Sequence, residues 1–272
     1  MRDELYSICW NITSKCNEDC KFCYRKVVQD NSLEENKLIF DKLSKIKIGK
    51  ISFCGGEPLL YEDLFELVNY IRSINPDIKL SITTNGKIID EELFEKIIRT
   101  FDWITFSIDT LDPKINEEIG RGSNHLNNII KLLNLCDGLI KVKINTVAMK
   151  SNINELPIIY EVISKYNISR WKVMRFYPLR RGKKNEELFS LDEEYSEYIQ
   201  NVINELNNKS PFAIHYNDFN EFSYSYFNIY PDGSIENSDD LDIGNLNNMS
   251  LSEILYLKNK DLQQHSLRRK YE

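Results

Sequence analysis

The 272-residue sequence has no apolar run long enough for a signal peptide or a membrane-spanning helix. It also lacks an excess of basic residues, since 35 Lys and Arg face 42 Asp and Glu, for a formal net charge of −7. An acidic chain is a poor non-specific ligand for nucleic acid or anionic membrane. We therefore expect a cytoplasmic protein that has neither nucleic acid nor a membrane as a partner.

Cysteine is absent after residue 136, and the six cysteines of the sequence are unevenly spaced. Three of them, Cys16, Cys20 and Cys23, fall within eight residues. This clustering differs from the cysteine pattern of a secreted disulfide scaffold, and in a reducing compartment it favours metal ligation. Internal repeats and low-complexity tracts are absent too, which argues against a solenoid.

Short β-branched and aromatic runs alternate with amphipathic helical stretches along the first two thirds of the chain. The pattern predicts repeated βα units around a parallel sheet. Strands are expected at residues 6–12, 49–53, 78–83, 103–108, 140–147 and 170–176, and helices at 33–46, 62–74, 90–100, 124–136 and 154–166. Six such repeats predict the α/β class, as a partial (β/α)6 TIM-like barrel over residues 1–182.

The texture of the sequence changes in residues 183–272, which are expected to form a small C-terminal extension covering the mouth of the barrel. An acidic helix is predicted at about 191–207. A small hairpin is predicted near 224–237, because Pro231-Asp232-Gly233 favours a turn between two strand-like runs.

Two helices of the barrel region begin with the signature of a capping box, Ser32 with Glu35 and Asn152 with Glu155. Because connections in βα units are short, the turns fall at strand C-termini, where barrel enzymes place their chemistry.

The cysteine cluster Cys16-x3-Cys20-x2-Cys23 supplies three soft thiolates from one tight loop. Such ligands suit an iron–sulfur cluster, and three ligands for a four-iron cluster leave one iron open. The alternatives are a zinc knuckle or chance clustering. The missing fourth Cys or His at zinc spacing and the βα context argue against both.

The next predicted strand ends in Gly55-Gly56-Glu57-Pro58, and Tyr24 follows the last clustered cysteine. Together with the cysteine spacing, this resembles the radical S-adenosylmethionine (SAM) superfamily over roughly residues 6–180. The resemblance implies a four-iron four-sulfur cluster on Cys16, Cys20 and Cys23, with SAM bound at the open iron. It also implies that SAM is reductively cleaved to a 5′-deoxyadenosyl radical that abstracts hydrogen from substrate. An external one-electron donor such as flavodoxin or ferredoxin would be required.

The same resemblance places SAM contacts at the ends of successive strands. A Gly-Gly turn lets the backbone approach a ligand closely, and the Glu57 carboxylate is expected to fix the geometry around the methionyl ammonium. For Thr84 and Asp109, N-capping of the following helix is an alternative explanation. The expected SAM-binding residues are Tyr24, Gly55, Gly56, Glu57, Pro58, Thr84, Asn85, Ser107, Asp109 and Asn145. Cys54 is assigned no ligation, whereas Cys9 and Cys136 are expected to be buried small apolar side chains.

Three further segments, Ile119–Gly122, Lys141–Thr146 and Arg170–Val173, resemble viperin and its prokaryotic relatives in order and spacing. The resemblance implies a lyase that dehydrates a nucleoside triphosphate to its 3′-deoxy-3′,4′-didehydro analogue, a chain terminator in antiviral defence. It implies substrate contacts at Asn11, Lys143, Arg170 and Lys172.

The three cations among these residues agree with an anionic substrate. Buried at a barrel mouth they would be costly to desolvate, whereas a triphosphate offers several charge-assisted hydrogen bonds. Alternation along an exposed strand would give the same sequence pattern. Tyr226 and Tyr230 are candidate hydrogen donors. The nucleobase stays open.

Two other functions stay open. The segments Ser107–Pro113 and Gly120–Gly122 also resemble the GTP cyclase of molybdopterin biosynthesis, and Tyr230–Gly233 resembles part of the extension of radical SAM peptide-modifying enzymes. In both cases the cysteines for an auxiliary cluster are missing. The second alternative is a non-catalytic SAM- or iron–sulfur-binding partner protein, against which the intact CxxxCxxC and GGEP motifs argue.

Overall fold

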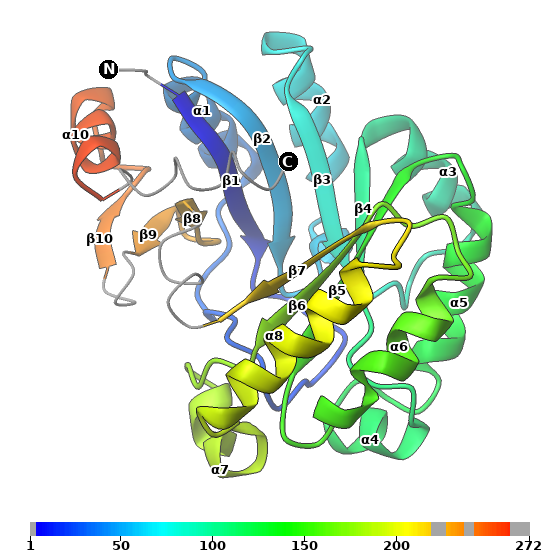
Figure 1. The fold of residues 1–272 in the computed structure, drawn as a ribbon. Coiled ribbons are helices and arrows are strands. Elements are labelled where there is room, and N and C mark those ends of the chain that lie inside the picture. The colour runs from blue at the N-terminus through cyan, green and yellow to red at the C-terminus, as the bar shows by residue number, and fades with distance from the viewer. Residues whose placement is uncertain (1–3, 219–226, 237–241, 262–272) are drawn as a thin grey trace. The chain divides into compact units, whose positions relative to one another are not determined.

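The computed structural model describes residues 4–218, 227–236 and 242–261, with side chains from residue 7 to residue 257. Strands followed by helices recur along the chain (Figure 1). The described residues form two compact units, one made of 4–15, 26–82 and the residues after 226, the other of 16–25 and 83–218. Within these ranges no helix is long and apolar enough to cross a membrane.

The first unit is built on parallel strands. β1 lies between β2 and the short β8, β2 pairs in turn with β3, and β8 and β10 each pair antiparallel with β9. Its strands are β1 (Glu4–Thr13), β2 (Lys47–Gly55), β3 (Lys79–Thr84), β8 (Phe227–Ile229), β9 (Ser234–Glu236) and β10 (Asp242–Asn245), and its helices are α1 (Leu33–Leu43), α2 (Leu64–Ile74) and α10 (Leu251–Asp261).

The second unit has four parallel strands that pair in chain order, β4 with β5, β5 with β6 and β6 with β7. Its strands are β4 (Trp103–Ser107), β5 (Lys141–Ala148), β6 (Arg170–Arg175) and β7 (Ala213–Asn217). Its helices are α3 (Glu91–Thr100), α4 (Pro113–Glu118), α5 (His125–Leu135), α6 (Leu156–Ile163), α7 (Glu186–Phe189) and α8 (Glu194–Asn207).

Alternation along the strands separates an apolar face from a polar one. On β5 and β6 the side chains of Val142, Ile144, Trp171 and Val173 are at most 1% exposed and belong to the core. Lys143, Asn145, Arg170 and Lys172 occupy the intervening positions and so lie on the opposite face. On β1 the buried Ile8, Trp10 and Ile12 alternate with Cys9 and Asn11 in the same way. Burial of one face therefore fixes which residues the other face presents.

The predicted α/β class and its order of elements are confirmed. Each of the six predicted strands and five predicted helices is present, with ends displaced by a few residues. The predicted helix at 191–207 is α8, and β8 and β9 pair antiparallel around the Pro231 turn, although residues 224–226 and 237 lie outside the described part. The sequence did not predict α4, α7, β7, β10 and α10; of these, α4 and β7 are only six and five residues long. The boundary after residue 182 stays a prediction.

One of the two predicted capping boxes is wrong. Ser32 and Glu35 form theirs with both hydrogen bonds. The Asn152 side chain instead donates from Nδ2 to the carbonyl of Asp109, two residues after β4, and to the carbonyl of Val147 in β5. Glu155 accepts from Thr110 Oγ1 and Leu111 N. Tertiary contacts with strand ends have replaced the local cap.

We predict that Gly55→Ala lowers the free energy of unfolding by about 1–3 kcal/mol, the range for a strained backbone position. Gly55 has φ +132°, and an added Cβ would lie 2.5 Å from the Thr13 carbonyl oxygen. The matched control is Gly138→Ala, where φ is +72° but the nearest atom is 4.0 Å away. Urea unfolding of the cluster-free proteins measures both. If both variants lost the same free energy of unfolding, the close contact between residue 55 and the Thr13 carbonyl would not be what requires glycine there.

Candidate functional site

The cysteine loop, residues 16–23, is held against the segment after α4 by backbone hydrogen bonds. Asp19 N donates to the Gly120 carbonyl at 3.3 Å, and Lys21 N donates to the Ile119 carbonyl at 2.9 Å. Gly120 has φ +89°, and a Cβ there would collide with the Asp19 carbonyl. At the other end of the loop, Gly182 N donates to the Cys23 carbonyl at 3.2 Å. These contacts fix the loop independently of any side chain.

The three loop cysteines suit an iron–sulfur cluster. All three residues are partly exposed. The amide of Arg25 donates to Cys23 Sγ at 3.4 Å, a contact that stabilises a thiolate. Among the described residues, no three His, Cys, Asp or Glu side chains converge as the ligands of one ion do. A four-iron cluster presents a different iron to each thiolate, so its ligands are spread around it.

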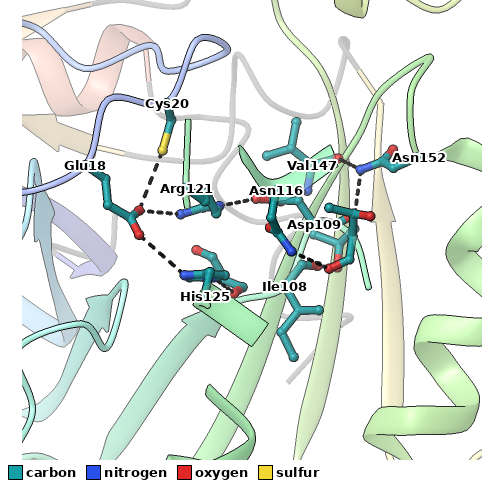
Figure 2. Close-up of polar contacts among 12 residues, drawn as sticks. Glu18, Cys20, Ile108, Asp109, Asn116, Arg121, His125, Val147 and Asn152 are labelled. Atoms are coloured by element: carbon teal, nitrogen blue, oxygen red, sulfur yellow. Dashed lines mark hydrogen bonds and ion pairs between the residues drawn. The ribbon is translucent and has the colours of Figure 1, made fainter. Parts of the chain in front are cut away.

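A buried group of charged side chains lies directly beside this loop (Figure 2). Arg121 pairs with Glu18 from Nη1 at 3.1 Å and with Asp109 from Nε at 2.5 Å. His125 Nδ1 is 3.4 Å from the other Glu18 oxygen, and its Nε2 donates to the Ser107 carbonyl at 2.8 Å. The side chains of Glu18, Asp109, Arg121 and His125 are at most 8% exposed. Together they join the cysteine loop to the C-terminal end of β4.

The pKa values in this group follow from burial and pairing. Burial alone would raise the pKa of Glu18, but the hydrogen bond with His125 and the charge of Arg121 lower it below its usual value. Burial alone would lower the pKa of Arg121, but Asp109 and its other acidic neighbours raise it. Burial raises the pKa of the Cys20 thiol to about 12, opposed by the charge of Arg121. Glu18 and Arg121 are therefore an ionised pair at neutral pH.

Asp109, a predicted SAM contact, has protein partners for both carboxylate oxygens. Oδ2 accepts from Arg121, and Oδ1 accepts from Val147 N at 2.8 Å (Figure 2). The alternative of helix capping is wrong for Asp109, because Asp112 caps α4. It is wrong for Thr84 as well, whose hydroxyl accepts from Gly86 N while Asp90 caps α3. Asp109 therefore has the geometry of a support for Arg121.

Three other predicted SAM contacts lie at strand ends of the same unit. Asn85 donates from Nδ2 to Asn17 in the cysteine loop at 2.7 Å. Ser107 and Asn145 are direct neighbours across β4 and β5. In the part of the chain that the structure describes, Asn145 Oδ1 is buried and accepts no hydrogen bond, so it offers an acceptor to a ligand. Tyr24 is 41% exposed, and its carbonyl accepts from Arg180.

The Gly55–Pro58 segment belongs to the first unit. Gly56 N donates to the Thr13 carbonyl and Glu57 N donates to the Lys15 carbonyl, both at 2.8 Å. The Glu57 side chain is fully buried, and its Oε1 accepts from Leu59 N at 3.2 Å. The segment is thus bonded to the residues that directly precede Cys16 in the chain. Asn11, a predicted substrate contact, donates to the Ile229 carbonyl at 3.1 Å.

The three predicted substrate-binding cations occupy adjacent positions on β5 and β6. Lys143 is the direct neighbour of Arg170, and Lys172 lies between Asn145 and His215. Burial first, and then the charges of Arg170, Lys172 and Lys143, lower the pKa of His215 to about 4. His215 is therefore neutral at neutral pH.

Several residues of the site could not be predicted from the sequence. His215 lies on β7, a five-residue strand within a stretch whose aromatic residues hide its alternation. Arg121 belonged to a recognised segment but had no assigned role. Glu18 stands between two cysteines, which is the one local signal that could have pointed to it. Of the candidate hydrogen donors, Tyr226 lies outside the described residues, and Tyr230 is buried with Lys26 Nζ 5.0 Å from its ring centre.

Comparisons with known proteins agree on one superfamily. The family model of the radical SAM superfamily matches residues 10–163. Two relatives called S-adenosylmethionine-dependent nucleotide dehydratase are similar to the chain. The one from Flammeovirga pacifica is 28% identical over 71% of this chain and 71% of its own length, and the one from Selenomonas ruminantium is 34% identical over 62% and 65%. A probable GTP 3′,8-cyclase of Methanococcus maripaludis is 31% identical over 71% and 67%.

The fold has a match among solved structures. Streptococcus suis SuiB bound to S-adenosylmethionine superposes with a TM-score of 0.72 at 18% identity, over 93% of this chain and 66% of that one. This likeness shows the fold, the partial (β/α)6 barrel that the sequence predicted. The family model spans more than half of the chain and includes the cysteine loop and the Gly55–Pro58 segment. The chain belongs to the radical SAM superfamily, whose members are enzymes that use a four-iron four-sulfur cluster and SAM as cofactors.

Proposed function

We propose that this enzyme dehydrates a nucleoside triphosphate to its 3′-deoxy-3′,4′-didehydro analogue. The observation that carries the proposal is the group of three cations on one face of β5 and β6. Lys143 lies beside Arg170, and Lys172 lies two residues further along β6. The names of the two dehydratase relatives support the same substrate class. On this proposal the product serves antiviral defence, in the cytoplasm.

The cation group has the properties of a polyphosphate site. Lys172 is only 6% exposed, and a buried ammonium is costly unless anions surround it. After burial, the charges of these three cations contribute to the lowered pKa of His215 on the neighbouring strand. A triphosphate would supply charge-assisted acceptors to all three cations at once. A polyanionic ligand would therefore suit this cluster of like charges.

The remaining roles follow from position. Cys16, Cys20 and Cys23 would hold the cluster, which together with SAM and an electron from flavodoxin or ferredoxin supplies the radical that abstracts hydrogen. Asn85 would contact SAM beside the cysteine loop, and Asn145 Oδ1, which accepts no hydrogen bond from the described residues, would accept one from it. The backbone of Gly55–Pro58 would contact the methionyl end of SAM.

A GTP cyclase is the second candidate, and the 31% identity to the probable cyclase of Methanococcus maripaludis favours it. The cation group suits either enzyme, since both substrates are triphosphates. The product distinguishes them, because dehydration removes one water from the nucleotide whereas cyclisation keeps its mass. Anaerobic turnover with each of the four ribonucleoside triphosphates, followed by mass spectrometry, tests the proposal. A product of unchanged mass formed from GTP alone would contradict it.

We predict that Cys16→Ala, Cys20→Ala and Cys23→Ala each abolish cluster binding and SAM cleavage, because every thiolate holds a separate iron. The wild-type protein should bind about four irons per chain after anaerobic reconstitution, as one cluster of this type requires. Iron analysis and 5′-deoxyadenosine formation are the measurements. Cys136→Ala is the control, because Cys136 lies outside the cysteine loop, at the end of α5, and is only 1% exposed. Full iron content in Cys20→Ala would refute the assignment.

We predict that Lys143→Ala, Arg170→Ala and Lys172→Ala each weaken nucleotide use by about one to two orders of magnitude, because a charge-assisted hydrogen bond is worth roughly 1.5–3 kcal/mol. Triphosphates should stimulate 5′-deoxyadenosine formation more than diphosphates, and diphosphates more than monophosphates. The matched control is Lys141→Ala, on the same strand but exposed, with its ammonium 5.2 Å from the Trp103 ring centre. Wild-type turnover in Lys172→Ala, or an equal response to cytidine and its triphosphate, would contradict a nucleotide dehydratase.

A further inference from the structure

Glu18 is the only residue of the cysteine loop whose side chain carries a charge in the interior of the protein. It stands between Cys16 and Cys20, and its carboxylate is 2% exposed. Arg121 Nη1 holds one oxygen at 3.1 Å, and His125 Nδ1 lies 3.4 Å from the other. The carboxylate therefore has one fixed position within the loop (Figure 2).

That position is next to a sulfur that would bind iron. Glu18 Oε2 is 3.7 Å from Cys20 Sγ, and Figure 2 draws this contact between the two side chains as a dashed line. Burial around both groups reduces solvent screening, so a charge acts more strongly here than at the surface. Arg121 does not cancel the effect completely, because its guanidinium is shared with the Asp109 carboxylate.

We propose that Glu18 holds a negative charge beside the cluster. This charge keeps the reduction potential of the cluster more negative than the three thiolates alone would make it. Reduction adds one negative charge to the cluster, and a fixed carboxylate beside a ligating sulfur opposes that addition. Net charge and contacts at the sulfurs are among the factors that set the potential of such clusters. A more negative potential makes the reduced cluster a stronger reductant. The inference rests on the cluster assignment and is independent of the nucleotide substrate.

Glu18→Gln separates this role from support of the loop. The glutamine keeps the size of the side chain and an oxygen that can accept from Arg121, but it removes one negative charge. The loop itself is still held by the backbone bonds from Asp19 and Lys21 to Gly120 and Ile119. The cluster should therefore assemble in this variant, with its potential altered.

Asp19 offers a matched control in the adjacent position. Its side chain is 81% exposed and pairs with Arg181 at the surface. Asp19→Asn removes the same unit of charge from the same loop, but in water and salt that charge is screened. Glu18→Asp is a second control, because it keeps the charge while shortening the side chain by one methylene.

The experiment uses the full chain, reconstituted anaerobically in wild-type, Glu18→Gln, Glu18→Asp and Asp19→Asn forms. Iron content is measured first, and the midpoint potential is then obtained by titration with dithionite, with the electron paramagnetic resonance signal of the reduced cluster as the readout. We expect full iron in all four proteins and a shift to more positive potential in Glu18→Gln alone. Asp19→Asn and Glu18→Asp should stay near the wild-type potential.

Three results would overturn the proposal. The first is an unchanged potential in a fully loaded Glu18→Gln protein. The second is an equal shift in Asp19→Asn or Glu18→Asp, which would show that burial or charge of Glu18 is not the cause. The third is loss of iron in Glu18→Gln, which would make Glu18 a requirement for assembly. Because each readout precedes substrate addition, failure here leaves the nucleotide dehydratase proposal standing, and the reverse holds as well.

Discussion

The ion pairs of Arg121 are the interaction on which the rest of the site depends. A guanidinium that is 8% exposed is tolerable only because Glu18 and Asp109 both pair with it. Glu18 connects Arg121 to the cysteine loop. Asp109 connects it to the segment that follows β4 and, through a hydrogen bond from Val147, to the end of β5. One buried cation thus joins the loop that would carry the cluster to the strands that would carry the substrate. Loss of either carboxylate would leave Arg121 with a single ion-pair partner.

The second constraint is the alternation of side chains on the parallel strands. Val142, Ile144 and Trp171 must be buried, and this places Lys143 and Arg170 together on the opposite face. The positive charge of that face is a consequence of the same register, which also places His215 on β7 beside Lys172. Core packing and the proposed triphosphate site therefore have one structural origin.

Much of the fold could be predicted because the signals are local. The 3.6-residue and two-residue periodicities located the main helices and strands, and Ser32 with Glu35 formed the expected cap. The failures are positions where distant contacts override local preference. The Asn152 side chain bonds to the backbone of Asp109 and Val147 and does not cap a helix. The strand β7 forms because β6 pairs with it, and not because its five residues are strongly β-forming.

The candidate site divides along the same line. The sequence by itself determined the superfamily, because the cysteine spacing and the Gly55–Pro58 tetrapeptide are short, contiguous motifs whose chemistry depends on residue type and order. The resemblance to viperin named Lys143, Arg170 and Lys172 as substrate contacts, and their spacing along two strands predicted that they share one face. The tertiary structure alone decided that Glu18, Asp109, Arg121 and His125 form one buried group, and that His215 joins the cations. These residues lie up to 107 positions apart in the chain, Glu18 to His125, so only folding brings their charges within a few ångströms, where burial makes the interaction strong.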